Sequence, residues 1–109
     1  MANPALTEAV YYILLSLTQP MHGYGIMQNV EQLSGGRVRL APGTLYGAIT
    51  SLLEKGWIAA LADESESRKK EYHITAAGEE ALRGELMRLN ELVTNGARIL
   101  GVQHEKRDS

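Results

Sequence analysis

Three consecutive basic residues, Arg68, Lys69 and Lys70, form the densest positive run of the sequence. Their side chains carry positive charge and donate hydrogen bonds, which suits them to contact the phosphates of nucleic acid. Taken alone, such a run is more often a solvated strand edge, because edge strands use Lys to block aggregation. Arg37 and Arg39 lie upstream and are suited to the same phosphate contacts.

The segment 42–55 carries one apolar stripe at helical spacing, formed by Leu45, Ile49, Leu52 and Leu53. If this stripe faces inward, the opposite side carries small or hydroxylated residues until Glu54, where most exposed helices carry Lys, Glu and Arg. A helix so free of bulk can enter the major groove of DNA, which is about 12 Å wide, and its N-terminal amides favour a phosphate. The outward residues are Gly43, Gly47, Thr50 and Ser51, with Thr44 and Tyr46 on the flanks.

The residue patterns of common enzymes are missing from the sequence. Cys is absent, which excludes disulfides, Cys-based zinc sites and Cys nucleophiles. His22, His73 and His104 are isolated from one another, which argues against a metal site. No Ser stands in a Gly-x-Ser-x-Gly motif, and no carboxylate pair has apolar flanks that would raise a pKa. We therefore expect no enzyme activity and no cofactor.

Length and composition indicate one small domain, or one small domain plus a long helix. The chain has 109 residues, 44% of them hydrophobic, and a formal net charge of −2. This mild acidity argues against indiscriminate coating of nucleic acid but allows a local basic patch. No window reaches the roughly 20 apolar residues needed to span a bilayer, and the opening MANPALTEAV lacks the basic region of a secretion signal. We expect a cytoplasmic protein with no membrane partner.

Three helices are expected in the first half of the chain. Asn3 and Pro4 have the types of an N-cap and a first helical residue, and the following run 5–17 is apolar on nearly every side. Such a helix needs cover all round, so we expect a second chain on one face. A shorter helix is predicted from Gly23 to Ser34, and a third from Pro42 to Lys55.

A β-hairpin and a long helix are expected to follow. The segments 57–62 and 70–75 read as strands, and the acidic tip between them, with Asp63, Glu64 and Glu66, must lean away from any phosphate. Thr75 is the expected N-cap of a helix of about 25 residues, whose apolar side chains recur at coiled-coil spacing. The preceding domain offers little room to bury this seam, so a partner helix is its natural cover. The seam is formed by Leu82, Leu86, Leu89, Val93 and Leu100.

The order of these elements predicts a mainly α fold with a small β-hairpin. Residues 1–75 would form a winged helix-turn-helix domain, and residues 76–109 a dimerisation helix with a polar tail. The expected dimer interface includes the seam of the last helix and four residues at or near the first helix. These four are Leu6, Val10, Ile13 and Leu17.

Three stretches of the chain resemble the signature motifs of the PadR family of bacterial winged-helix transcriptional regulators. They are HGYGIMQNVEQLS (22–34), APGTLYGAITSLLEKGWI (41–58) and RKKEYHITAAGEEAL (68–82). The short final helix is similar to the compact branch of the family. The resemblance implies a homodimer whose last helix packs with the partner's first and last helices. It also implies repression by operator occlusion, relieved by a lipophilic or aromatic molecule near the dimer interface.

The resemblance carries over to individual positions. Tyr24 matches the aromatic residue of the family's H-G-Y motif, the beginning of the recognition helix matches at Pro42, Gly43, Thr44 and Tyr46, and the end of the wing matches at Tyr72 and Thr75. Two positions differ from the family pattern. Gly47 replaces a common Pro, and Glu66-Ser67-Arg68-Lys69-Lys70 replaces Gly-Arg-Pro-Arg-Lys.

The leading hypothesis is a homodimeric, sequence-specific DNA-binding repressor. Its two recognition helices would lie about one DNA turn apart, roughly 34–36 Å, on a near-palindromic operator. Tyr24 and Tyr46 fit either a phosphate contact or a core position with only the hydroxyl exposed. The residues expected at DNA are Tyr24, Arg39, Pro42, Gly43, Thr44, Tyr46, Gly47, Thr50, Ser51, Lys55, Arg68, Lys69 and Lys70.

Two other hypotheses stay open at the level of sequence. The first is a winged-helix module that docks onto another protein without binding DNA, as the overall acidity and the acidic wing tip suggest. The second, which overlaps with the repressor, is a sensor of small lipophilic molecules. Its pocket would lie between the first helix, at Tyr11, Tyr12, Ile13 or Leu17, and the second copy's final helix, at Leu86, Leu89 or Val93.

Overall fold

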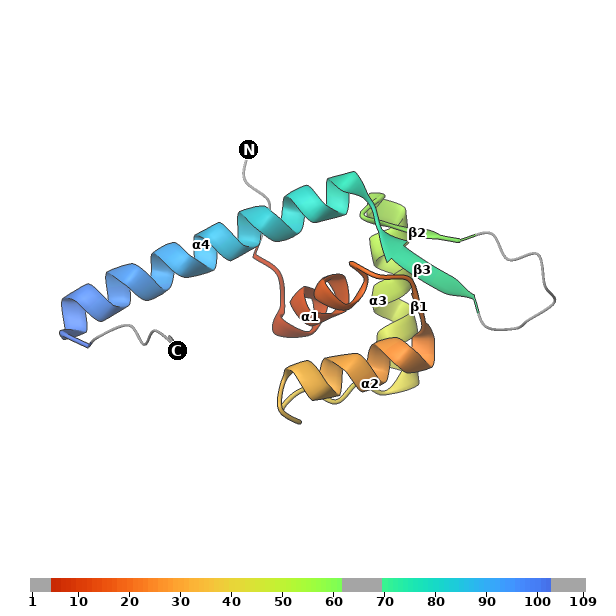
Figure 1. Cartoon of the computed structure of the whole chain (residues 1–109), viewed down its shortest axis with the longest axis horizontal. Coiled ribbons are helices and arrows are strands. Elements are labelled where there is room, and N and C mark those ends of the chain that lie inside the picture. The colour runs from red at the N-terminus through yellow and green to blue at the C-terminus, as the bar shows by residue number, and fades with distance from the viewer. Residues whose placement is uncertain (1–4, 62–69, 103–109) are drawn as a thin grey trace.

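The computed structural model describes residues 5–61 and 70–102 of the chain. Its elements are helices and three short strands, arranged as a winged helix-turn-helix followed by one long helix (Figure 1). The expected mainly α fold with a small β component is confirmed. The elements are α1 (Glu8–Ser16), β1 (Met21–His22), α2 (Gly23–Leu33), α3 (Pro42–Lys55), β2 (Ile58–Ala60), β3 (Glu71–Ile74) and α4 (Ala76–Leu100).

Helix α1 begins later than the sequence indicated. Its N-cap is Thr7, whose backbone is extended and whose Oγ1 accepts a hydrogen bond from the amide of Val10 at 3.1 Å. Glu8 follows in the first turn, where a carboxylate suits the helix dipole. The expectation that Asn3 caps this helix is therefore wrong, because Ala5 and Leu6 lie outside it.

Residues typical of helix ends mark the start of α2 and both ends of α3. His22 caps α2, with its Nδ1 accepting from the amide of Gly25 at 3.3 Å. Pro42 occupies the first turn of α3, where a missing N–H costs nothing. Gly56 ends α3 in the left-handed conformation, with φ of 75°, and its amide donates to carbonyls of the last turn.

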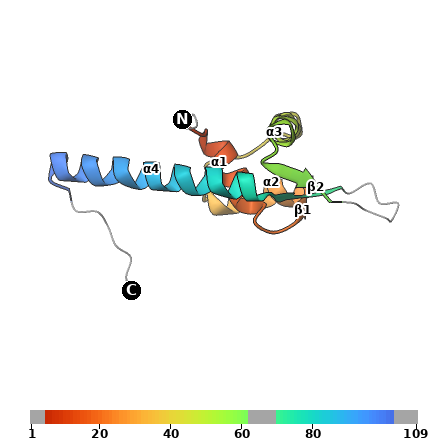
Figure 2. The ribbon, with the colours of Figure 1, turned by 90° about the horizontal axis from the view of Figure 1, so that it is seen from above.

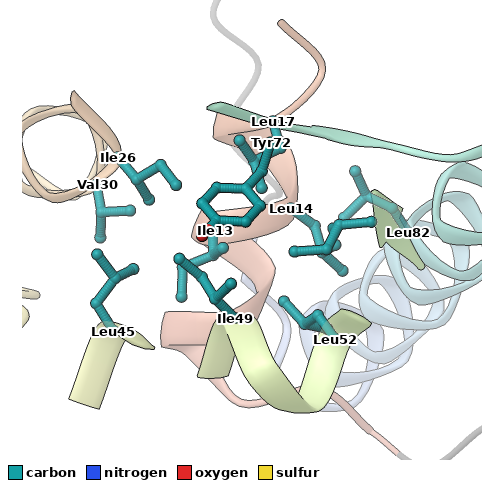
Figure 3. Close-up of a cluster of buried hydrophobic side chains, with 11 residues drawn as sticks. Ile13, Leu14, Leu17, Ile26, Val30, Leu45, Ile49, Leu52, Tyr72 and Leu82 are labelled. Carbon is teal, nitrogen blue, oxygen red and sulfur yellow. The ribbon is translucent and has the colours of Figure 1, made fainter. Parts of the chain in front are cut away.

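The hydrophobic core lies where α1, α2, α3, the sheet and the beginning of α4 meet (Figure 3). Ile13 and Leu14 of α1 and its C-cap Leu17 are completely buried there, in one cluster with side chains from the other elements. The expectation that Ile13 and Leu17 contact a second chain is therefore wrong. The other large apolar residues of α1, Val10, Tyr11, Tyr12 and Leu15, are half-buried against the same core.

The sheet has three strands, one more than expected. All pairs are antiparallel in the order β1-β3-β2, with Met21 opposite Tyr72 and Ile58 opposite Ile74. Strand β1 has only two residues, too few to show an alternating pattern. The expected hairpin tip, with its acidic residues and with Arg68 and Lys69, lies outside the described residues.

Backbone contacts fix the direction in which α4 leaves the domain. Thr75 caps the helix at the amide of Gly78, and its hydroxyl also donates to the carbonyl of Gly56 at 2.7 Å. A Cβ atom on Gly78 would lie 2.1 Å from the carbonyl oxygen of Trp57, so only glycine allows this approach. The first turn of α4 is thereby fastened to the loop that ends α3.

The rest of α4 extends away from the domain, as two perpendicular views show (Figures 1 and 2). The described chain measures 56 × 33 × 27 Å along its principal axes, and the long dimension follows α4. The buried residues of this helix all belong to its first ten positions: Gly78, Ala81, Leu82 and Glu85. Within the described ranges, no helix combines the length and apolarity needed to cross a membrane.

Candidate nucleic-acid interface

The outer face of α3 is open and almost without bulk. On the opposite face, Leu45, Ile49 and Leu52 are at most 2% exposed and form part of the core. Leu53 is 37% exposed, so the expectation that it belongs to the inward stripe is wrong. A Cβ atom added to Gly43 or Gly47 would meet nothing within 4 Å. The other expected groove residues of this helix are also exposed: Pro42, Thr44, Thr50, Ser51 and Lys55.

Tyr46 connects α3 to the beginning of α2. Its side chain is 47% exposed, and its hydroxyl would lie 2.1 Å from a Cβ atom built on Gly23. The ring therefore rests on the first residue of α2, in space that only a glycine leaves free. Tyr24, in the first turn of α2, is 62% exposed. Neither tyrosine is a core residue, and part of each side chain is exposed at this end of the helix pair.

A buried tyrosine stands behind this pair at the base of the wing. Tyr72 of β3 is 8% exposed. Burial raises the pKa of its hydroxyl above the usual 10.0, and electrostatic repulsion from Tyr46 raises this pKa further. Tyr72 therefore stays neutral at physiological pH.

Exposed cations come before and after α3 in the chain. Arg39, just before the helix, has its Nε 3.4 Å from Glu31 Oε2, and Arg37 pairs with Glu8. Exposed ion pairs of this kind contribute about 0–1 kcal/mol, so a phosphate can replace the carboxylate partner. Lys70, just before β3, is exposed, whereas Arg68 and Lys69 fall outside the described residues.

Lys55 is the last residue of α3, at the opposite end of the helix from Arg39. Its Nζ lies 4.9 Å from the centroid of the Trp57 ring, a cation–π distance. Ser51, one turn earlier on the same helix, is also exposed. Positive charge consequently flanks both ends of the recognition-helix surface.

A second apolar surface lies on α4. Leu86, Val93 and Leu100 are 54%, 46% and 76% exposed, which leaves most of the expected seam uncovered in a single chain. Leu6, Val10 and Leu89 are half-buried. Leu82 is only 7% exposed and belongs to the core of its own subunit, so it offers little surface to another chain.

Glu85 is a buried charge that the sequence analysis missed. Its carboxylate is 6% exposed, accepts the amide of Leu6 at 3.2 Å, and accepts two hydrogen bonds from Arg88, at 2.9 and 2.6 Å. The hydrogen bonds from Arg88 hold the pKa of Glu85 below its usual value against the opposing effect of burial. The Glu-x-x-Arg spacing signals the pair, but nothing local signals the bond to Leu6.

The part of the chain that the structure describes contains no cluster of side chains that could bind a metal ion. Over residues 5–61 and 70–102, no three side chains of the metal-ligating acidic and imidazole types gather in one place. His22 is used as a helix cap instead.

Sequence comparison assigns the chain to a known family. The model of the transcriptional regulator PadR-like family matches residues 12–84. The chain is also 39% identical, over 79 residues, to a 37.1 kDa protein of transposon Tn4556 from Streptomyces fradiae. The match covers 72% of this chain and 22% of that protein, so the chain spans less than a quarter of the relative's length.

Solved structures share the fold. A PadR family transcriptional regulator from Eggerthella lenta superposes with a TM-score of 0.69 at 24% identity, covering 86% of this chain and 82% of that one. A PadR family regulator from Clostridium difficile has a TM-score of 0.68 at 18% identity, covering 85% and 97%. A PadR-like regulator from Bacillus cereus has a TM-score of 0.67 at 20% identity, covering 90% and 92%. These likenesses establish the winged-helix fold.

Proposed function

The chain belongs to the transcriptional regulator PadR-like family, and from this premise we propose that it is a homodimeric repressor that binds operator DNA through α3. One observation carries the proposal. The outer face of α3 is exposed, and Gly43 and Gly47 leave it without side-chain bulk. Such a surface has no structural use within the domain, whereas it permits close approach to the floor of a DNA groove.

In this proposal, different residues recognise the DNA bases and contact the DNA phosphates. Thr50 and Ser51 carry hydroxyls on the groove-facing side of α3, where they can bond to base edges. The Thr50 hydroxyl donates to the carbonyl of Tyr46 at 3.0 Å, which leaves its oxygen free to accept. Arg39, Lys55 and Lys70 contact phosphates and fix the register of the helix on the duplex.

The two tyrosines add contacts beside the groove. Tyr46 places its hydroxyl at the beginning of α2, and Tyr24 lies in the first turn of that helix. A helix N-terminus favours an anion, because its amides and dipole present positive charge. The phosphate that lies nearest to α2 would accept from these hydroxyls.

A second copy of the chain best explains the apolar face of α4. The start of this face, at Leu82 and Glu85, is buried in its own domain. Leu86, Leu89 and Val93 continue the face at helical spacing along the part of α4 that extends beyond the domain. In a two-fold dimer, the apolar face of α4 packs against the same face of the second copy, so no other protein is needed to cover it. The two α3 helices would then read the half-sites of a near-palindromic operator, about 34–36 Å apart. Repression follows if that operator overlaps a promoter, and a small lipophilic effector would release it.

The wing provides a direct test of the DNA contact. Replacing Lys69 and Lys70 with Ala is expected to weaken binding by about the same factor on every duplex. It should also reduce the slope of log K against log salt by roughly one unit per lost phosphate contact. Fluorescence anisotropy with labelled duplexes at several salt concentrations measures both quantities.

Arg83→Ala is the control for this experiment, because Arg83 is an exposed cation that lies within α4 and outside the wing, paired with Glu79 at 3.7 Å. Its affinity and salt slope should stay at the wild-type values. A double wing variant that binds like wild type at all salt concentrations would remove the wing from the mechanism. Wild-type protein that fails to bind any duplex at low salt would contradict the proposed function itself.

A further inference from the structure

Glu85 is a buried carboxylate that the proposed DNA contact does not use. Over the described ranges 5–61 and 70–102, it is the one charged residue that is buried. A buried ion pair adds little stability compared with apolar side chains of the same volume. Stability therefore gives no reason for a charge here, whereas hydrogen bonds to a carboxylate fix direction and distance in a way that apolar contacts do not.

The carboxylate of Glu85 joins α4 to the segment that precedes α1. Its Oε2 accepts from the amide of Leu6 at 3.2 Å, and its two oxygens accept from Arg88, one turn further along α4, at 2.9 and 2.6 Å. Leu6 and Leu52 of α3 line the same hollow, so the segment that carries Leu6 lies beside the recognition helix. One buried side chain thus links the long helix to a segment that lies along α3.

A separate set of contacts holds the first turn of α4. The Thr75 hydroxyl donates to the carbonyl of Gly56, the C-cap of α3, at 2.7 Å, and the Thr75 amide donates to the carbonyl of Trp57 at 2.9 Å. The start of α4 and the end of α3 therefore meet at one point. A helix held at one point alone is free to tilt about it, and a second contact further along removes that freedom. Glu85 supplies this second contact seven residues beyond Gly78, about 10 Å along the helix.

We propose that Glu85 is a positioning residue that sets the angle between α4 and α3, and thereby the separation of the two recognition helices in the dimer. The inference rests on the proposed function, because this separation matters only on DNA with two half-sites. Helix α3 has 14 residues and is about 21 Å long, with its C-terminal end at the point shared with α4. In a dimer joined through α4, a tilt of about 10° displaces the start of α3 by about 4 Å, which is close to one base-pair step of roughly 3.4 Å.

This position requires a carboxylate rather than an amide. The two oxygens of Glu85 accept three hydrogen bonds, and both partner residues act as donors. Gln has one acceptor oxygen, and its amide nitrogen would face either the Leu6 amide or the Arg88 guanidinium, which also donate. The Arg88 side chain is 40% exposed, so water can solvate it in Glu85→Gln. The substitution therefore loosens the link without leaving a buried unpaired charge.

Spin-label distances within one chain test the position of α4 without any DNA. The chain has no Cys, so Ala41→Cys and Thr94→Cys place one label at the exposed start of α3 and one on the exposed far half of α4. Subunit exchange with an excess of unlabelled protein leaves only the distance within one chain in double electron–electron resonance. The otherwise wild-type chain should give one narrow distance distribution, and Glu85→Gln should broaden it at least two-fold.

Glu79→Gln is the matched control for this measurement. Glu79 is an exposed carboxylate of the same helix, paired with Arg83 at 3.7 Å, so the same chemical change is made away from the link to Leu6. The Glu79→Gln variant should keep the narrow distribution. A narrow distribution in folded Glu85→Gln would overturn the proposal.

Leu6→Pro tests the same link from its other side and decides the question even if Glu85→Gln does not fold. Proline has no amide hydrogen, so this variant removes the donor and leaves the pair of Glu85 and Arg88 in place. Its distance distribution should broaden as in Glu85→Gln, whereas Ala5→Pro, one exposed residue earlier, should keep the narrow one. The melting temperature of each variant confirms folding. Equal distributions in Leu6→Pro and Ala5→Pro would contradict the role of the Leu6 amide.

The effect on DNA is measured separately, on an operator obtained by in vitro selection. Duplexes with one base pair more or fewer between the half-sites should bind wild-type protein and Glu79→Gln at least ten-fold more weakly than the selected operator. Glu85→Gln should discriminate less than three-fold, while it binds a single half-site with wild-type affinity. A loss of folding would instead weaken binding to the single half-site as well.

The outcomes separate this inference from the proposed function. A ten-fold spacing preference that persists in Glu85→Gln would refute the link between the angle of α4 and DNA recognition, and the proposed DNA-binding function would stand. If the wild-type protein binds no duplex at all, the proposed function fails. The spin-label distances then still decide whether Glu85 positions α4.

Discussion

Gly47→Leu is expected to lower DNA affinity by at least about 100-fold without loss of folding. The position is exposed near the middle of α3, and a Cβ atom there meets nothing within 4 Å. Replacing a mid-helix Gly removes a cost of roughly 1 kcal/mol, so the variant should be slightly more stable than wild type. The leucine side chain then stands on the face that must enter the groove. Specific complexes typically exceed non-specific ones by 10³-fold or more, and most of that margin requires close groove contact.

Gly84→Leu is the matched control for this substitution. Gly84 is an exposed glycine of α4 with equally open surroundings, so the same side chain is added to a helix at similar cost. Both variants should melt at or above the wild-type temperature, and only Gly47→Leu should lose DNA in an anisotropy titration. Wild-type affinity in Gly47→Leu would show that α3 does not approach the bases.

Leu86→Lys is expected to convert the dimer into monomers. Leu86 is 54% exposed in a single chain, so the substitution costs the isolated subunit little. In the proposed dimer, the two-fold axis would bring two lysines into an apolar seam without partners. A buried unpaired charge costs about 3–5 kcal/mol, which raises the dimer dissociation constant by 100-fold or more. Sedimentation velocity over a range of protein concentrations measures the shift.

Met87→Lys provides the control on the neighbouring residue. Met87 is 71% exposed and points about 100° around the helix from Leu86, away from the apolar face. The Met87→Lys variant should sediment like the wild-type protein. Dimers that persist in Leu86→Lys, or monomers in Met87→Lys, would place the interface on another face of α4.

Local sequence signals located most of the elements. Pro42 and Gly56 mark the two ends of α3, and Thr75 marks the start of α4, because each residue type satisfies a backbone requirement at its own position. The open face of α3 also followed from the sequence, since a tight apolar stripe at helical spacing leaves the glycines on the other side.

Tertiary packing decided what the sequence could not. The apolar run of α1 requires cover on all sides but does not say which chain supplies it, and here the same domain buries Ile13 and Leu17. Strand β1 exists because β3 lies beside it, and its two residues carry no pattern of their own.

Long-range contacts at the site could not be predicted from the sequence either. Gly23 is required by Tyr46, which comes from the next helix, and the two are 23 positions apart in the chain. Glu85 reaches the amide of Leu6 across 79 positions. No periodicity or short motif relates such positions, so these contacts emerge only from the folded chain.

The most direct test of the central claim is to map duplex DNA onto the protein by ¹H–¹⁵N chemical-shift perturbation. A short duplex added at low salt is expected to move the backbone amide signals of Gly43, Gly47 and Lys70 most strongly. Signals from the far half of α4, such as Leu92 and Ile99, should hardly move. Perturbations confined to α4, or none on α3 at saturation, would contradict DNA recognition by the glycine-bearing face of α3.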